Sequence, residues 1–440
     1  MPRNYFGKIK KLIDASEFIE FNGRVTKITG MTVESTGPIV NIGDVCKIYP
    51  NVGLSFIYAE VVGFRDSSVL LMPYGSISGI GHGNRVVATG MDYGVMVSEQ
   101  LRGRILDALG NPMDGGPQIG SASHYPIENE PPSPLERKRI AEPLILGVRA
   151  IDSLLTMGRG QRVGIFAGSG VGKSTTLGMI ARSSDADINV IVLVGERGRE
   201  VRDFIENDLG QEGLKKSIVV VATSDMPAML RLKSAMTGTS IAEYFRDKGY
   251  NVLLLMDSIT KFAMAQREIG MAVGEPPVAR GYTPSVYAIL PKLLERSGNS
   301  GDGSITAIYT VLVEGDDINE PISDTVRGIL DGHFVLSRKL ANSNHYPPID
   351  ILASISRLMP QVTSPQHYAM AQEIKNMMSS VAEAESLLMI GAYKQGADPV
   401  LDRALEKKDL INAMLKQRKD EISTFDEIME MLKEITNYGE

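Results

Sequence analysis

The sequence of 440 residues has little of several residue types that would point to particular classes of protein. It contains one cysteine, Cys46, so no intramolecular disulfide can form, which is typical of a reducing compartment. Tryptophan is absent and aromatic residues make up 6% of the chain, so we expect an aliphatic core that also uses the 22 methionines. No run of 18 or more apolar residues occurs and no signal-peptide pattern opens the chain. These absences predict a cytoplasmic protein that is still able to dock on a membrane complex.

Two further absences argue against a structural zinc site and against an overall electrostatic attraction to nucleic acid. The five histidines have no cysteine or second histidine at ligand spacing, which argues against a structural zinc site. The net charge of −7 gives no overall attraction to nucleic acid, and leaves only a local basic patch as a means of binding it. The rest of the composition, 43% hydrophobic and 22% charged, is that of an ordinary soluble protein. The length of 440 residues predicts two or three domains.

A phosphate-binding loop is the strongest motif in the chain. The β-forming run 162–166 leads into small residues that end in Gly-Lys-Ser, and a helical stretch, 175–182, follows. Glycines in such a loop turn backbone N–H groups toward an anion, and the next helix directs its positive end to the same place. Lys173 is expected to reach the β- and γ-phosphates of ATP, and the Ser174 hydroxyl to hold Mg²⁺. Ala167 stands where the consensus has glycine. The predicted nucleotide-binding residues of this loop are Gly168, Ser169, Gly170, Val171, Gly172, Lys173, Ser174 and Thr175.

The pattern of residue types along the chain divides it into four regions. Residues 1–17 predict a short basic amphipathic helix that packs on its own domain or on a partner. Residues 18–90 alternate short β-rich runs with Gly, Asn and Pro, which predicts a small β-barrel. Residues 91–360 form the P-loop core, where strand-like runs that are apolar on both faces alternate with helices, as in a doubly wound parallel sheet. Residues 361–440 predict a helical domain. The expected barrel strands are 23–29, 44–49, 57–64, 68–72 and 84–88; the expected core strands after the loop are 189–194, 217–222, 251–256 and 305–312; and the expected C-terminal helices are 365–393, 399–416 and 421–437.

Acidic residues follow two of the buried core strands. Asp257 ends the run that begins at Val252, and a carboxylate there lies at the mouth of the sheet, where it holds Mg²⁺ through water. Glu196 follows another buried strand and is the best-placed carboxylate to orient and polarise the attacking water. Arg197 is a candidate to neutralise phosphate charge, and Glu200 to hold Mg²⁺-bound waters.

Taken in order, the motifs resemble the α/β-subunit superfamily of rotary ATP synthases. The segments that carry the resemblance are 168–174, 195–200, the strand ending at Asp257, 276–284 and 347–356, and they span nearly the whole chain. Within the superfamily, the segments 166–174, 195–204 and 390–399 resemble the ATPase of flagellar protein export, and next to it the ATPases of virulence-type III secretion. Ala167 matches the export-type form of the loop.

The resemblance implies roles for further residues and for partners. It makes Glu196 the catalytic base, Arg197 a phosphate-side arginine and Asp257 the Walker B acid. It also makes Tyr346 the aromatic residue that stacks on adenine and Arg357 an arginine finger that acts in trans. We therefore expect an Mg²⁺-dependent ATPase that assembles as a homohexamer at the inner-membrane export apparatus. The implied partners are a stator-like export regulator at the N-terminal helix, a central stalk-like protein, export chaperones with their substrates, and the membrane export gate, with no nucleic acid.

Four alternatives stand beside the flagellar interpretation. A virulence secretion ATPase shares the same motifs. The catalytic subunit of a rotary synthase carries an acidic run where this chain has Tyr393-Lys-Gln-Gly-Ala-Asp-Pro399, which disfavours it. An RNA translocase requires aromatic residues on a basic N-terminal surface, and the runs between 23 and 88 show no such interleaving. A non-catalytic nucleotide-binding subunit would lack the loop lysine or the base, whereas Lys173 and Glu196 are both present.

Overall fold

The computed structural model of the chain describes residues 22–50, 55–90, 93–313, 315, 317 and 320–438. The helix predicted over 1–17 lies outside the described residues. The chain divides into two compact units. One contains the residues up to Tyr93 together with Glu268–Glu275, and the other contains Gly94–Arg267 and Pro276–Glu440.

The first unit contains a closed barrel, as the sequence predicted. Its strands follow one another in the order β1-β2-β5-β4-β3-β6, and inward side chains such as Val33, Ile48 and Val61 are fully buried. Strand β2 was not predicted, because it has only four residues and follows β1 directly through a turn in which Gly30 has a positive φ of 58°. The strands are β1 (Asn22–Thr29), β2 (Thr32–Ser35), β3 (Val45–Tyr49), β4 (Ile57–Arg65), β5 (Ser68–Pro73) and β6 (Arg85–Ala88).

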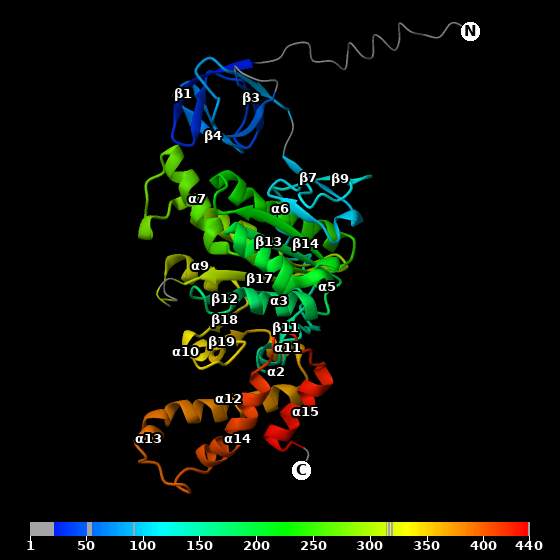
Figure 1. The fold of residues 1–440 in the computed structure, drawn as a ribbon, viewed down its shortest axis with the longest axis vertical. Helices are drawn as coiled ribbons and strands as arrows, with labels where there is room; N and C mark the ends of the chain where they lie inside the picture. Colours follow the sequence, from blue (N-terminus) through cyan, green and yellow to red (C-terminus); the bar gives the residue numbers. More distant parts are fainter. Residues whose placement is uncertain are drawn as a thin grey trace, which may run out of the picture. The chain divides into compact units, whose positions relative to one another are not determined.

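The second unit is built around a mixed sheet of nine strands within the described residues (Figure 1). Its order is β19-β18-β12-β17-β15-β13-β14-β8, with β16 paired to β17. The strands are parallel except β16 and β19, which pair antiparallel with β17 and β18. The bounds are β8 (Ile105–Asp107), β12 (Arg162–Ala167), β13 (Ile188–Glu196), β14 (Ser217–Thr223), β15 (Asn251–Asp257), β16 (Gly298–Ser300), β17 (Gly303–Leu312), β18 (Gly332–Leu336) and β19 (Ile349–Ser356). The predicted parallel core is confirmed.

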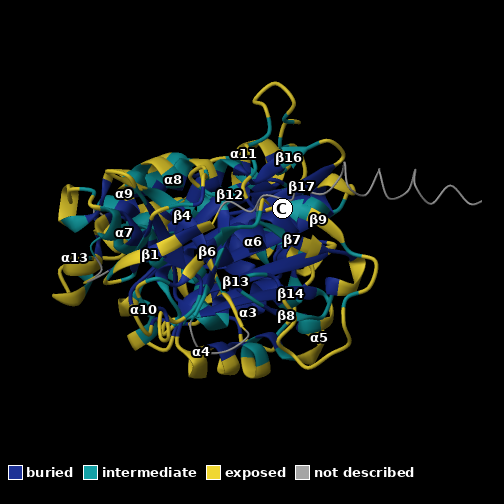
Figure 2. Cartoon of the chain, turned by 90° about the horizontal axis from the view of Figure 1, so that it is seen from above, coloured by how far each residue is buried: buried dark blue, intermediate teal, exposed yellow. Residues whose placement is uncertain are grey.

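Helices cover both faces of this sheet. Helix α6 (Ala228–Asp247) packs on β13, β14, β15 and β17, and α3 (Lys173–Ser183) packs on β15 from the opposite face (Figure 1). Figure 2 shows that the central strands are buried, whereas the outer faces of the surrounding helices are exposed. The other helices of the core are α2 (Arg149–Leu154), α4 (Gly198–Asp203), α5 (Gly210–Lys215), α7 (Ile259–Val273), α8 (Pro284–Glu295), α9 (Pro321–Ile329), α10 (Arg338–Asn342) and α11 (Met359–Val362).

Small two-stranded sheets pair β7 (Gly94–Val97) with β9 (Ser123–Pro126) and β10 (Pro143–Leu144) with β11 (Met157–Gly158).

The C-terminal residues form helices, as predicted, with different ends. They are α12 (Pro365–Glu383), α13 (Glu385–Met389), α14 (Pro399–Leu415) and α15 (Phe425–Thr436). Helices α12, α14 and α15 pack on one another and all three contact α2 of the core. The last helix starts later than predicted, because Thr424 caps it through a reciprocal capping box with Glu427. Among the described residues, no helix combines the length and the apolar character needed to cross a bilayer.

Candidate active site

The predicted phosphate loop connects β12 to α3. Gly170 and Gly172 have φ of 75° and 102°, which is the region that side chains with a Cβ rarely adopt. Gly172 stands directly before the first residue of α3, Lys173. The Val171 side chain is buried in the hydrophobic core, so only its backbone can serve a ligand. A pocket of about 770 Å³ lies over the loop and is lined by Gly168, Ser169, Gly170, Gly172, Lys173, Ser174 and Thr175, among others.

Four charged side chains meet at this loop. Lys173 Nζ lies 2.5 Å from Asp257 Oδ1 and 3.6 Å from Glu196 Oε1. Lys261 Nζ lies 2.7 Å from the same Glu196 oxygen. Burial alone would lower the pKa of Lys173, but the charges of Asp257 and Glu196 outweigh it, so its pKa lies above the usual value. The loop lysine is therefore held charged between the two predicted acids.

The sheet register explains why these side chains converge. Strands β13 and β15 are parallel neighbours with Leu193 opposite Asp257, so Glu196 and Asp257 leave the same edge of the sheet. Thr310, on the adjacent strand β17, donates a hydrogen bond of 2.7 Å to Asp257 Oδ1. Asp257 and Glu196 are 3% and 8% exposed. Glu196 and Asp257 were therefore assigned to the correct strand ends from the sequence alone.

Arg197 and Glu200 lie at the rim of the same pocket. Both line it, and they form an ion pair of 3.6 Å between Arg197 Nη1 and Glu200 Oε1. Their side chains are 80% and 50% exposed, in contrast to the buried Glu196. Their predicted contacts with phosphate and with Mg²⁺-bound water stay predictions.

The oxygen-bearing side chains at the loop fit a magnesium ion that arrives with a nucleotide. Ser174 and the carboxylates of Glu196 and Glu200 line the pocket, and Asp257 forms an ion pair with Lys173, which also lines it. The described part of the chain contains no group of three acidic, histidine or cysteine side chains arranged to hold a metal. Magnesium commonly takes one or two protein oxygens, several waters and the phosphates of its substrate. A hydroxyl with one water-mediated carboxylate matches that requirement.

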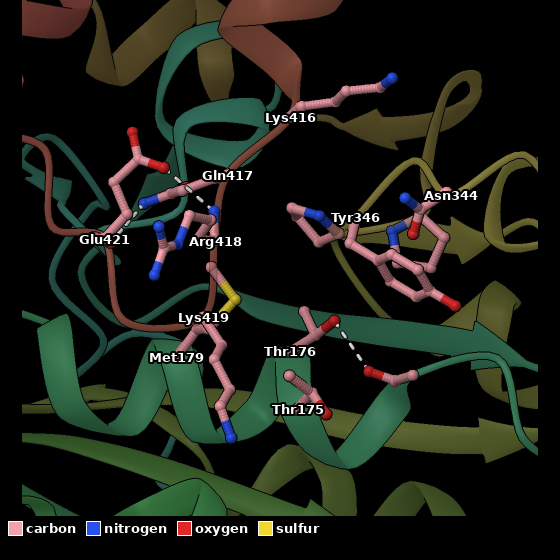
Figure 3. A pocket seen from close by; sticks show the side chains of 13 residues that line it. Thr175, Thr176, Met179, Asn344, Tyr346, Lys416, Gln417, Arg418, Lys419 and Glu421 are labelled. Atoms are coloured by element: carbon pink, nitrogen blue, oxygen red, sulfur yellow. Dashed lines mark hydrogen bonds between the residues drawn. The ribbon is translucent and has the colours of Figure 1, made fainter.

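A second pocket, of about 440 Å³, shares residues with the first and is drawn in Figure 3. Tyr346 forms one side, Thr176 and Met179 of α3 form the floor, and residues 416–421 form the side facing Tyr346. Gly172 and Thr175 line both pockets. The cavity is mainly apolar, of a size suited to a small planar ligand, and continuous with the phosphate loop. Tyr346 is 44% exposed at this pocket, so its position fits the predicted stacking on adenine.

Arg357 lies outside both pockets of its own chain. It follows β19, its side chain is exposed, and its backbone N–H donates 3.1 Å to the carbonyl of Asp331. The structure therefore does not bring Arg357 to its own Lys173 and Glu196. Its role in trans stays a prediction.

Sequence reasoning missed several residues at the two pockets. Lys261 stands four residues after Asp257, so the first turn of α7 carries it back over the same edge. Arg338, the first residue of α10, donates 3.2 Å from Nη2 to the carbonyl of Ser169 in the loop. Residues 416–421 gave no local signal, because only the packing of the C-terminal helices brings them to Tyr346.

Comparison with known proteins places the chain in a family. Residues 147–356 match the nucleotide-binding domain of the ATP synthase alpha/beta family, residues 25–90 match the beta-barrel domain of that family, and residues 363–434 match the T3SS EscN ATPase C-terminal domain. The flagellum-specific ATP synthase of Bacillus subtilis is 53% identical over 98% of this chain and 100% of its own length. The type 3 secretion system ATPase of Xanthomonas euvesicatoria is 48% identical over 94% of each chain.

A solved structure agrees with these matches in sequence and in shape. The assembled ATPase EscN from the type III secretion system of enteropathogenic E. coli superimposes with a TM-score of 0.89 at 46% identity, over 94% of this chain and 99% of that one. The barrel, the nucleotide-binding sheet and the C-terminal helices all lie within the aligned length. This chain is an ATP-hydrolysing enzyme that belongs to the ATP synthase α/β family, among its flagellar and type III secretion ATPases.

Proposed function

We propose that this enzyme hydrolyses Mg·ATP to energise the export of flagellar proteins, by helping to release cargo from export chaperones and unfold it at the export gate. The observation that carries the catalytic part is the convergence of Lys173, Glu196 and Asp257 over a glycine-rich loop. The flagellar assignment rests on full-length similarity to the Bacillus subtilis protein. The alternative, a virulence secretion ATPase, is supported by similarity to the Xanthomonas protein, and the match of residues 363–434 to the T3SS EscN ATPase C-terminal domain favours an export ATPase over a rotary synthase subunit.

In the proposed reaction, the loop N–H groups and Lys173 hold the triphosphate, and Tyr346 stacks on the base. Glu196 accepts a proton from a water whose oxygen attacks the γ-phosphorus, while the bond from that phosphorus to the bridging oxygen of ADP breaks. Mg²⁺, held by Ser174 and through water by Asp257, would neutralise phosphate charge when it is bound. Lys261 flanks Glu196 and restricts the directions in which its carboxylate can point.

The proposal includes a homohexamer in which Arg357 completes the site of a neighbouring subunit. An exposed Arg357 beyond β19 and the assembled state named for the EscN structure support it. A second EscN structure is described as a complex with its central stalk EscO, which supports a stalk-like partner here. A stator-like regulator at residues 1–17, export chaperones with their substrates and the export gate complete the proposed partners, at the cytoplasmic face of the inner membrane.

The test of the proposed catalytic base is Glu196→Gln. The amide keeps the shape of the side chain but cannot accept the proton, so turnover should fall by about 10²- to 10⁴-fold while ATP binding stays within a few-fold. Glu206→Gln is the matched control, because Glu206 is exposed and pairs with Arg202 outside both pockets, and it should leave turnover unchanged. Steady-state phosphate release and equilibrium nucleotide binding give the two readouts. Retained turnover in Glu196→Gln would remove Glu196 as the base.

A further inference from the structure

Gln417 is a buried side chain at the pocket beside Tyr346 whose contacts all run to the backbone. It is 3% exposed and follows the end of α14. Its Oε1 accepts a hydrogen bond of 2.9 Å from the N–H of Arg149, and its Nε2 donates 2.9 Å to each of the carbonyls of Gly147 and Glu421. The three bonds use its acceptor and both donor hydrogens. A buried amide satisfied in this way is rigid, because any rotation leaves buried groups without partners.

The backbone of Gln417 reaches the opposite side of the same pocket. Its N–H donates 2.8 Å to the carbonyl of Tyr346, the residue expected to stack on the base. One residue therefore connects residues 416–421, Tyr346 and the turn that precedes α2. In Figure 3 the Gln417 side chain lies beside Glu421, across the pocket from the Tyr346 ring.

The turn to which Gln417 is anchored is itself fixed. Both carboxylate oxygens of the fully buried Asp152 accept backbone hydrogen bonds, 2.9 Å from Leu146 and 2.7 Å from Gly147. The Arg149 side chain adds a bond of 2.9 Å to the carbonyl of Met414 and further bonds to the carbonyl of Lys416 and the carboxylate of Glu421. The ATPase core thus holds the segment from several points around Gln417.

Two backbone donors of residues 416–421 are already used within the protein. The N–H of Gln417 is used by Tyr346, and that of Arg418 donates 3.0 Å to Glu421 Oε2. Neither backbone donor is left for a base. The position of this side of the pocket relative to the Tyr346 ring sets the space that a planar base can occupy.

We propose that Gln417 is a positioning residue for the nucleoside end of the substrate: it sets the spacing between residues 416–421 and Tyr346, and so the affinity for the base. The inference rests on the proposed function, because it takes the apolar pocket as the base site of the ATPase. It separates the contribution of the base from that of the phosphates, which bind at Lys173 in the neighbouring pocket.

The experiment compares equilibrium binding of ADP and of magnesium tripolyphosphate, which carries phosphates but no base. Gln417→Leu keeps the bulk of the side chain and removes all three hydrogen bonds. We expect the Kd for ADP to rise about tenfold, the Kd for tripolyphosphate to change less than about twofold, and kcat at saturating ATP to be retained within about twofold. Gln211→Leu, an exposed glutamine of α5 outside both pockets, is the matched control and should change none of these.

A second variant keeps the test valid if Gln417→Leu does not fold. Gln417→Asn retains the amide but withdraws it by one methylene group, and should show the same selective loss of ADP binding. Equal weakening of both ligands, or unchanged ADP binding in the folded variants, would overturn the inference in favour of a purely structural glutamine. Failure of the wild-type protein to bind either ligand would instead contradict the proposed function.

Discussion

The two pockets proposed to bind the phosphates and the base of the nucleotide are built in opposite ways. The phosphate pocket is dense in charge: Lys173, Lys261, Glu196 and Asp257 approach one another at strand ends of a single sheet. The base pocket is mainly apolar and combines α3, Tyr346 and residues 416–421, which are far apart in the sequence. The first depends on sheet register, whereas the second depends on how the C-terminal helices dock on the core.

This difference separates chemistry from affinity. Changes in the phosphate pocket act on the transferring phosphoryl group and should appear mainly in kcat. Changes in the base pocket act equally on the ground state and the transition state, since the base does not react, and should appear mainly in KM. Substitutions at each pocket, and one away from both, test this separation of effects on kcat from effects on KM.

Arg357→Ala should give the largest effect. An arginine supplied by a neighbouring subunit stabilises charge on the transferring phosphoryl group, and such residues are worth about 10³-fold or more in kcat. Because Arg357 lies outside the pockets of its own chain, ADP binding to the dilute protein should change little. Phosphate-release assays at saturating ATP, with binding measured in parallel, check both points. A normal kcat would exclude Arg357 from the mechanism.

Tyr346→Ala should weaken nucleotide binding without a comparable loss of kcat. Stacking of a base on an aromatic ring contributes about 1–3 kcal/mol, so KM for ATP should rise by about 5- to 150-fold. Tyr346→Phe keeps the ring and serves as the control, with KM close to the wild-type value. If the alanine variant loses kcat and keeps KM, the division between the two pockets is wrong.

Asp114 lies away from both pockets, so Asp114→Asn should change the free energy of unfolding and leave catalysis unchanged. Two hydrogen bonds of 2.7 Å from the Arg104 guanidinium hold the pKa of Asp114 well below its usual range. A carboxylate with a lowered pKa stabilises the fold above its unfolded pKa of about 3.9, and this contribution is lost as the pH falls below about 4. At pH 7 the variant should be less stable by about 1–2 kcal/mol, with unchanged KM. Thermal unfolding of both proteins from pH 7 to pH 3.5 should show the difference shrinking; a constant difference would contradict this cause.

The sequence was sufficient for the phosphate pocket because its signals are local. Glu196 and Asp257 each end an apolar run, so the sequence alone could assign them to strand ends of a parallel sheet, and the Gly-Lys-Ser motif could assign Lys173 to the start of the helix after the loop. Lys261 was also within reach, since helical spacing after Asp257 places it over the same edge.

The edge strands β18 and β19 and the base pocket could not be predicted in the same way. Strand β19 has no strict alternation of buried and exposed residues, and it joins the sheet antiparallel beside β18, so neither strand was expected. Gln417 lies at the end of a helix that was predicted correctly, but its three partners depend on how α14 docks against the turn before α2. Such contacts follow from tertiary packing and leave no periodic pattern in the sequence.

The most direct test of the central claim, a site shared between subunits, is to mix two inactive variants. Glu196→Gln lacks the base but still offers Arg357 to a neighbour, whereas Arg357→Ala retains the base but offers no arginine. In mixed assemblies, an Arg357→Ala subunit whose site receives Arg357 from a Glu196→Gln neighbour is complete, so ATPase activity should reappear, reach a maximum near equal amounts and fall on dilution. Mixtures that stay as inactive as either variant alone, at concentrations where the wild-type protein assembles, would contradict the account.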